Sequence, residues 1–318
     1  MIDCVQTVVE AVILFSFLWC PATFLRRFLP AGAMGANVRG THTLTSSKVR
    51  CMDFFALIQS TLTADGLIPA WSILIIAGGS FLAGFVDSIA GGGGLISLPA
   101  YAATGLPLHF AIGTNKLASA MGTIVATIKY ARSGYMLAWL CAPCVVAALV
   151  GSDIGAHLSL LASEDFLRIF MLIIIPIAGF YVLRHKELGE ADADWPRKKT
   201  LALCLAISLF IGAYDGFYGP GTGTFLMLLL TSVGGLGANH AAGVTKCANL
   251  TTNLTALVVF AVNGTCLFVL GILGGIFNML GNYLGSTQFT EKGNTVVRPI
   301  MLIVLVLFAA KLIFELVA

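Results

Sequence analysis

Asp87, Lys116, Asp215 and Lys246 are charged side chains that lie inside long apolar stretches of this sequence. A charge at the centre of a bilayer costs at least about 2.5–3.5 kcal/mol on insertion scales, so it needs a partner of opposite charge or a polar cavity. A bound anion can also neutralise a buried lysine. The four residues therefore indicate either structural Asp–Lys pairs, aspartates that cap a broken helix, or an anion site. In an anion site the lysines would bind the substrate, and the aspartates would balance charge or carry a proton.

Two glycine clusters accompany short apolar segments. Gly91–Gly94 lies before residues 95–106, and Gly219–Gly223 overlaps the start of residues 222–236. A helix N-terminus leaves about four N–H groups free and carries partial positive charge, which favours a bound anion. Glycine lets a ligand approach this backbone, although small residues equally allow helices to pack closely. If an anion binds at these helix N-termini, the backbone groups that contact it are those of Gly92, Gly93, Gly94, Gly221 and Thr222.

Amides and hydroxyls accompany both lysines. Thr114 and Asn115 directly precede the first lysine, whereas Asn249 and Asn253 follow the second and share one helix face with it. These groups could hold sulfonate or carboxylate oxygens, and they could equally form hydrogen bonds between helices. We therefore keep all four as candidate binding residues, with both readings open.

Other reactive side chains give weaker signals. Cys141 and Cys144 form a C-x-x-C motif inside an apolar run, where cysteine more commonly serves as a small apolar residue. His109 and His240 precede the two lysine-bearing segments and are expected to be capping or solvated groups. The sequence contains no P-loop or H-E-x-x-H motif. It therefore predicts no catalytic residue, metal site or cofactor.

The composition indicates a membrane protein. Hydrophobic residues make up 58% of the 318 residues, charged residues 10%, and the mean hydropathy is +0.94. A soluble domain carries about 25% charged residues. A soluble enzyme and a secreted disulfide protein are therefore excluded, and a net charge of +3 is too small to predict nucleic-acid binding. The expected partners are the lipid bilayer and a small anion, and homo-oligomerisation is left open.

The long apolar runs predict an all-α polytopic fold with about eight full spans and two short half-helices. The half-helices are the segments that follow the glycine clusters. The predicted full spans are 71–90, 110–131, 134–156, 165–183, 200–218, 243–262, 265–285 and 296–316.

The two halves of the chain repeat each other. The Gly-x-x-Asp motif that ends at Asp87 recurs at Asp215, 128 residues later. The Gly-x-x-Lys motif that ends at Lys116 recurs at Lys246, and the Gly-x3-Gly pair that begins at Gly151 also recurs, both 130 residues later. Duplicated halves with glycine-interrupted segments in matching positions are typical of secondary transporters, whose substrate sites lie between the repeats.

Lysine and arginine in the short loops predict the orientation. Lys129 and Arg132 share a side with the basic 184–199 loop, and the intervening 153–165 loop contains no base. If each half crosses five times, the basic 286–298 loop also faces the cytoplasm, the repeats are inverted and Ala318 lies outside. If each half crosses four times, the repeats are parallel. We expect the inverted arrangement, because all the basic loops then face the cytoplasm, although a dozen residues can barely span.

The sequence divides into four parts. Residues 52–183 form the first transmembrane repeat, 184–199 a cytoplasmic linker, and 200–318 the second repeat. Residues 1–51 have no repeat equivalent, and their bases contradict the predicted topology. Met52 is therefore an alternative start, and we expect deletion of residues 1–51 to leave insertion and transport intact.

Three stretches resemble a known family, and they lie at residues 83–96, 111–116 and 215–223. Their sequences are AGFVDSIAGGGGLI, AIGTNK and DGFYGPGTG. They resemble the TauE/SafE sulfite-exporter family, particularly its YfcA-type bacterial inner-membrane proteins, over about residues 70–316. The resemblance implies a multi-pass transporter built from two repeats, for sulfite, sulfonates or related sulfur and carboxylate anions. The second half has Val-Thr-Lys where the first has Thr-Asn-Lys, so an internal two-fold symmetry would be imperfect.

The leading hypothesis is a secondary transporter that moves a small anion by alternating access in a bacterial inner membrane. Without a nucleotide motif, its energy should come from an ion gradient or the membrane potential. The alternatives are a membrane-embedded enzyme, which the absence of catalytic motifs disfavours, and an anion channel. The sequence does not fix the substrate, the direction of transport or the coupling ion.

Overall fold

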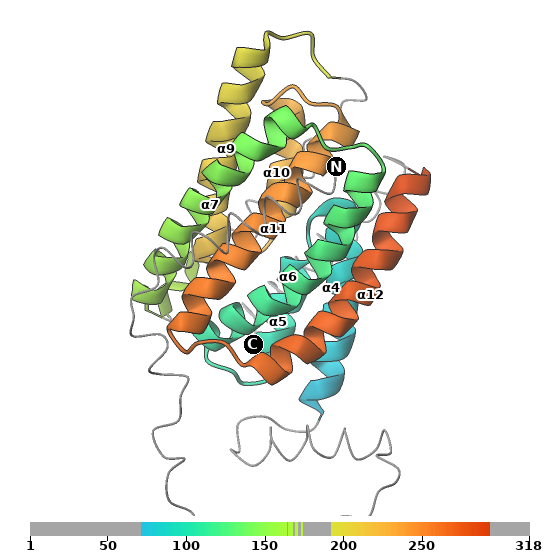
Figure 1. Cartoon of the computed structure of the whole chain (residues 1–318). Helices are drawn as coiled ribbons and strands as arrows, with labels where there is room; N and C mark the ends of the chain where they lie inside the picture. Colours follow the sequence, from blue (N-terminus) through green and yellow to red (C-terminus); the bar gives the residue numbers. More distant parts are fainter. Residues whose placement is uncertain (1–70, 164, 168, 171–172, 174–191, 293–318) are drawn as a thin grey trace, which may run out of the picture.

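The computed structural model describes residues 71–292, except residues 164, 168, 171–172 and 174–191 (Figure 1). All the regular secondary structure of these residues is helical. The helices are α4 (Ser72–Ala90), α5 (Gly94–Ala102), α6 (Leu108–Arg132), α7 (Ala138–Leu161), α9 (Arg197–Phe217), α10 (Thr222–Ser232), α11 (Ala238–Val262) and α12 (Phe268–Lys292). The all-α prediction is thus confirmed for this part of the chain.

Glycines break the chain after α4 and after α9. Gly91 follows α4 with φ 71°, and Gly219 and Gly221 follow α9 with φ 96° and 80°. Only glycine adopts this left-handed backbone readily, so the breaks are set by residue type. The helices that follow are short, at 9 residues for α5 and 11 for α10. Both lengths agree with the predicted half-helices.

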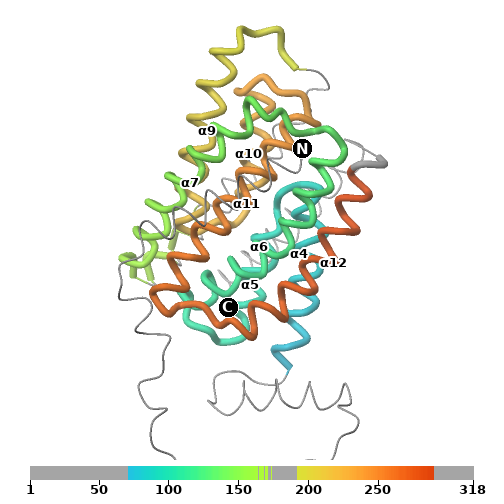
Figure 2. Tube along the Cα trace, viewed as in Figure 1, coloured from blue at the N-terminus to red at the C-terminus, as the bar shows by residue number. Residues whose placement is uncertain are grey.

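The two halves of the chain interlock. Helix α12 packs mainly on α4 and α6 of the first half, whereas α7 packs mainly on α9 and α11 of the second half. The lysine-bearing helices α6 and α11 also contact each other. In Figures 1 and 2, α7 and α9 run along one flank of the bundle, α4 and α12 along the other, and α6 and α11 lie between them. Residues of both halves therefore meet along the middle of the bundle.

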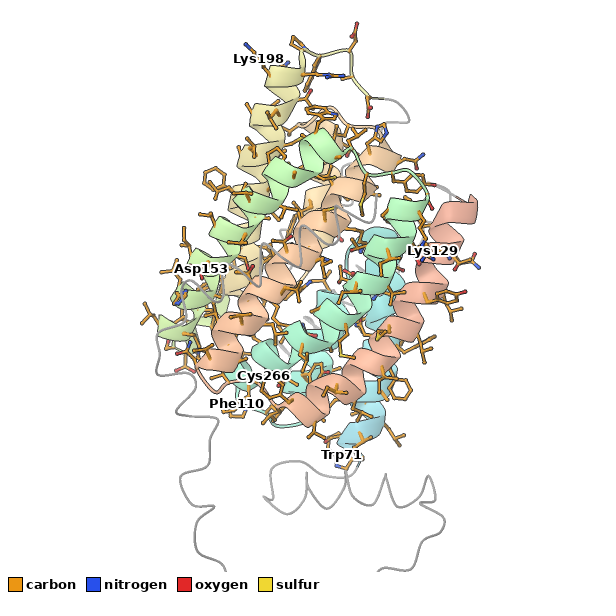
Figure 3. The ribbon with its side chains drawn as sticks, viewed as in Figure 1. Trp71, Phe110, Lys129, Asp153, Lys198 and Cys266 are labelled. Carbon is orange, nitrogen blue, oxygen red and sulfur yellow. The ribbon has the colours of Figure 1, made fainter. Side chains whose placement is uncertain are left out.

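Helices α6 and α11 run in opposite directions. Figure 3 places Lys129, near the end of α6, and Lys198, at the start of α9, toward one end of the bundle. Trp71, Phe110 and Cys266 lie toward the other end. Helix α6 therefore starts near the end at which α11 finishes. Helices α6 and α12 finish together, because Lys129 Nζ donates a hydrogen bond to Thr287 of α12.

Small residues bring the interlocked helices into backbone contact. A Cβ atom added at Gly151 or Gly155 of α7 would lie 2.2 or 2.0 Å from a carbonyl oxygen of α9. A Cβ at Gly281 or Gly285 of α12 would lie 2.1 or 2.3 Å from a carbonyl oxygen of α4. Real Cβ atoms essentially never come within 3.0 Å of such an atom. These glycines thus form the small-residue helix contacts found in membrane proteins.

Four of the described helices, α4, α7, α9 and α12, are long and apolar enough to cross a membrane. Helices α6 and α11 also match predicted spans and have 25 residues each, but they are less apolar. Their buried faces carry the lysines, amides and hydroxyls. The predicted span 296–316 and most of 165–183 lie outside the described residues, as do residues 1–51 and the first half of the linker, 184–191.

Candidate functional site

Lys116 and Asp215 form a buried ion pair between α6 and α9. Lys116 Nζ lies 2.9 Å from Asp215 Oδ1, and each side chain is 3% exposed. Thr222, the first residue of α10, donates a hydrogen bond from Oγ1 to the same carboxylate oxygen at 2.7 Å. Gly219 makes room for this cluster, because a Cβ there would lie 2.7 Å from Asp215 Oδ1 and 2.8 Å from Lys116 Nζ.

Lys246 and Asp87 form a second ion pair between α11 and α4. Lys246 Nζ lies 2.9 Å from Asp87 Oδ2 and donates a hydrogen bond to the Asp87 backbone oxygen at 2.5 Å. The Asp87 side chain is 13% exposed, whereas that of Lys246 is 3% exposed. This pair therefore holds the end of α4 through both the side chain and the main chain.

Each pair joins the two halves of the chain. Lys116 of the first half binds Asp215 of the second, and Lys246 of the second binds Asp87 of the first. The four ionisable residues singled out in the sequence are thus all paired in this conformation, and all but the partly exposed Asp87 are buried. Because the pairs connect elements of different halves, any movement of one half against the other must alter them.

The two helix breaks touch between these ion pairs. A Cβ at Gly91 would lie 2.1 Å from the Gly223 carbonyl carbon, and one at Gly223 would lie 2.6 Å from Gly91 Cα. Thr224 N donates a hydrogen bond to Gly91 O at 3.1 Å, and Thr224 Oγ1 donates one to Ala90 O at 2.7 Å. Close packing between the two breaks, rather than the approach of a ligand, therefore explains why Gly91 and Gly223 are glycines.

The N-terminus of α5 has backbone donors that remain available. Among the described residues, the N–H groups of Gly92, Gly93 and Gly94 donate to no backbone carbonyl. Gly92 and Gly93 are buried, and a Cβ at Gly93 would lie 2.5 Å from Asp87 Cβ. At α10, the N–H of Thr222 donates to Gly219 O, but those of Gly219, Gly221 and Gly223 likewise donate to no backbone carbonyl among the described residues. Both breaks thus keep backbone donors near their aspartates.

The polar residues beside the lysines divide into two groups. Thr114 Oγ1 accepts a hydrogen bond from Leu267 N at 3.1 Å, and Asn253 Nδ2 donates one to Asn249 O at 2.8 Å. These contacts are structural. Asn115 Oδ1 and Thr245 Oγ1, which directly precede the lysines in sequence, are buried and have no hydrogen-bond partner among the described residues. They can still accept a donor from a ligand.

The cysteines and histidines take no part in this site. Cys141 and Cys144 form no disulfide and lie in the apolar core, and burial raises the pKa of Cys266 in the α11–α12 turn to about 11. His109 Nε2 lies 3.0 Å from Ser159 O, and His240 Nδ1 lies 2.6 Å from Asp192 Oδ2. No group of three metal-ligating side chains occurs among the described residues.

Three residues with structural roles at the site were not among the sequence candidates. Gly219 borders the Lys116 pair, Thr224 bonds to the end of α4, and Tyr214 donates a hydrogen bond from its hydroxyl to Pro220 O at 2.5 Å. Gly219 stands in the glycine cluster, where its spacing from the aspartate could have signalled its role. Nothing in the sequence marks Thr224 or Tyr214.

Comparison with known proteins gives consistent matches to membrane transporters. A probable membrane transporter protein, ORF9, from Sinorhizobium sp is 36% identical over 74% of this chain and 90% of its own. One from Haemophilus influenzae is 32% identical over 78% of this chain and 96% of its own. The probable membrane transporter protein YfcA of Escherichia coli K12 is 34% identical over 74% and 87%. No solved structure matches significantly.

The family model described as sulfite exporter TauE/SafE matches residues 76–312. This range contains both glycine breaks and all four members of the ion pairs. The match confirms the resemblance read from residues 83–96, 111–116 and 215–223. The chain therefore belongs to the TauE/SafE family of membrane transporters.

Proposed function

We propose that this protein is a secondary transporter that moves a small anion across the membrane by alternating access. The expected substrates are sulfite, organosulfonates and related sulfur or carboxylate anions. The observation that carries the proposal is the pair of buried lysines, each held by an aspartate of the other half beside a helix break. The lysines supply full positive charge, and the helix N-termini add partial positive charge.

The anion binds by taking the place of an aspartate as the partner of a lysine. An anion that contacts Lys116 or Lys246 replaces or weakens the lysine's contact with its aspartate. Because each ion pair connects the two halves, substrate binding then changes the contact between them. A ligand shifts a conformational equilibrium only through such a difference in contacts between states. Asn115, Thr245 and the N–H groups of Gly92–Gly94 are the nearby groups that could hold the anion's oxygens.

The directions of the helices support two inverted repeats with five crossings each. In both halves a long helix leads through a glycine break to a short helix, and the matching long helices run oppositely (Figure 3). Lys129 and Lys198 lie toward one end of the bundle. By the positive-inside rule, that end of the bundle faces the cytoplasm. The proposal therefore places the protein in a bacterial inner membrane, which it crosses several times.

Transport by purified protein in liposomes tests the proposal. Uptake of sulfite, thiosulfate, sulfoacetate, taurine and dicarboxylates is compared between wild type and the Lys116→Met, Lys246→Met double variant. We expect saturable uptake of at least one anion by wild type and none by the variant. Lys198→Met, which removes an exposed charge at the start of α9, is the control and should transport normally.

Folding must be separated from function in this test, because each lost lysine leaves a buried carboxylate unpaired. A second variant, Lys116→Met with Asp215→Asn, removes both members of one pair and keeps the site neutral. It should fold and still fail to transport. Normal kinetics in either folded variant would contradict the site. Flux without accumulation against a gradient would indicate a channel, and chemical conversion of the anion would indicate an enzyme.

A further inference from the structure

The Asp215 carboxylate has one satisfied and one unsatisfied oxygen. Oδ1 accepts hydrogen bonds from Lys116 Nζ at 2.9 Å and from Thr222 Oγ1 at 2.7 Å. Oδ2 is buried and has no hydrogen-bond partner among the described residues. A buried ionised oxygen without a donor is costly, because the solvation lost from water is not replaced. A proton bound at Oδ2 would therefore remove the free-energy cost of leaving this buried, ionised oxygen without a hydrogen-bond donor.

The charge balance of the site explains how a proton on Asp215 would help an anion to bind. Both lysines are occupied by aspartates in this conformation. An anion that binds Lys116 while Asp215 stays ionised would put two negative groups beside one buried cation. A proton on Asp215 removes one of those negative charges, so Lys116 can turn to the anion without leaving a charged carboxylate unpaired.

We propose that Asp215 binds, at Oδ2, the proton that this transporter moves together with its anion. The inference rests on the proposed anion transport and adds its coupling ion. The proton enters from water on the side from which the anion binds, frees Lys116 for the anion, and leaves on the other side when Lys116 returns to Asp215. No covalent bond other than the O–H bond forms or breaks.

The charged and titratable groups around Asp215 come from several helices. Lys116 comes from α6 and the Thr222 hydroxyl from α10, while the Tyr214 phenol lies nearby on α9 itself. On α11, which also packs against α9, Lys246 is bound to Asp87. On α7, Cys141 and Cys144 lie in the apolar core, whereas Asp153 and His157 lie 3.6 Å from each other and are partly exposed.

Asp87 differs from Asp215 in ways that suit it to a fixed charge. Its side chain is partly exposed, and Lys246 also holds its backbone oxygen. The Asp87 carboxylate is therefore less completely removed from solvent than that of Asp215, and Lys246 is anchored even when the carboxylate contact is weakened. We assign Asp87 to charge balance, so the two aspartates should respond differently to the same substitution.

Infrared difference spectroscopy tests the proton site without a substrate. Acidification of purified wild-type protein should produce a carboxylic C=O band from a buried protonated acid. The band should be absent in Asp215→Asn and present in Asp87→Asn. The exposed-residue control Asp165→Asn should resemble wild type. A band that persists in Asp215→Asn, or that disappears in Asp87→Asn alone, would overturn the proposal.

Thiosulfate fluxes in liposomes test the coupling itself. Wild type should accumulate thiosulfate when the side of uptake is acidified. Asp215→Asn should lose this accumulation while still exchanging internal for external thiosulfate, because Lys116 no longer needs a proton to be released. Asp87→Asn should transport more slowly, but its remaining flux should still follow the pH gradient.

The outcomes separate the two proposals. Accumulation by Asp215→Asn under a pH gradient, or accumulation by wild type that follows a sodium gradient instead, would overturn the proton assignment alone. Failure of wild type to move any of the screened anions would contradict the proposed function, while the infrared band would still decide where the proton binds.

Discussion

The two ion pairs occupy matching positions in the repeated sequence, yet their surroundings differ. Lys116 and Asp215 are enclosed, and Thr222 supplies a hydroxyl to the carboxylate. Lys246 and Asp87 lie where the carboxylate is partly exposed, and the lysine also binds the α4 main chain. Glycine stands at the first-half positions that align with Thr222 at either offset, so Asp87 has no such hydroxyl. Two similar ion pairs thus lie in different electrostatic surroundings.

The largest expected effect comes from breaking one pair while its partner stays charged. Removal of one member of a buried ion pair costs about 3–5 kcal/mol, because the remaining charge is left without compensation. Lys116→Met should therefore lower the free energy of unfolding more than Lys246→Met, whose partner is partly exposed. Denaturant unfolding of the purified protein in detergent measures the difference.

A double-mutant cycle sharpens this comparison. Because the pairs cross between the halves, Asp215→Asn should restore much of the stability lost in Lys116→Met, whereas Asp87→Asn should add to the loss. Coupling between Lys116 and Asp87, and none between Lys116 and Asp215, would show that the pairs form within each half instead.

The glycine breaks provide the next largest contrast. Gly91→Ala brings a Cβ to 2.1 Å from a backbone atom of Gly223, which cannot move aside, and overpacking of this kind costs about 1–3 kcal/mol or more. The Cβ atom added by Gly219→Ala would instead lie too close to the ends of the Lys116 and Asp215 side chains. We expect Gly91→Ala to impair folding chiefly and Gly219→Ala to impair transport chiefly. Unfolding and uptake are measured on both, with Gly134→Ala, which meets no atom within 4 Å, as the control for backbone strain.

A smaller effect is expected from the hydroxyl that distinguishes the pairs. Thr222→Val removes a hydrogen bond to a charged oxygen, worth about 1.5–3 kcal/mol. It should make ionised Asp215 less favourable and shift the pH dependence of transport toward higher pH. Thr224→Val removes a bond to a neutral carbonyl and should leave that pH dependence in place. An identical shift in both variants would contradict the role assigned to Thr222.

The smallest effect is expected at the N-terminus. A chain that begins at Met52 should insert into the membrane and transport at wild-type rates, since residues 1–51 have no repeat equivalent and precede the range matched by the family model. Fluorescence of a fused reporter in isolated membranes gives the amount inserted. Loss of the protein from the membrane fraction would show that this segment is required.

Sequence alone predicted the helices and the important charges, because both depend on local patterns. Apolar run length located α4, α7, α9 and α12, and the rarity of charge in such runs singled out Lys116, Lys246 and their aspartates. Sequence could not predict which lysine binds which aspartate, because that depends on how the halves interlock. Nor could it show that Thr114 serves the α11–α12 turn while Asn115 has a free oxygen, since both readings fit the same residues.

Direct anion binding is the measurement that tests the central claim most closely. A ligand present at about 100 times its dissociation constant stabilises the state that binds it by about 2.7 kcal/mol. Thermal unfolding in detergent is therefore followed with and without the anion that wild type transports, in wild type and in Lys116→Met, Lys246→Met with both aspartates changed to asparagine. The account predicts that the anion raises the unfolding temperature of wild type and leaves that of the folded variant unchanged. An equal increase in both proteins would show that the anion binds somewhere other than at the two lysines.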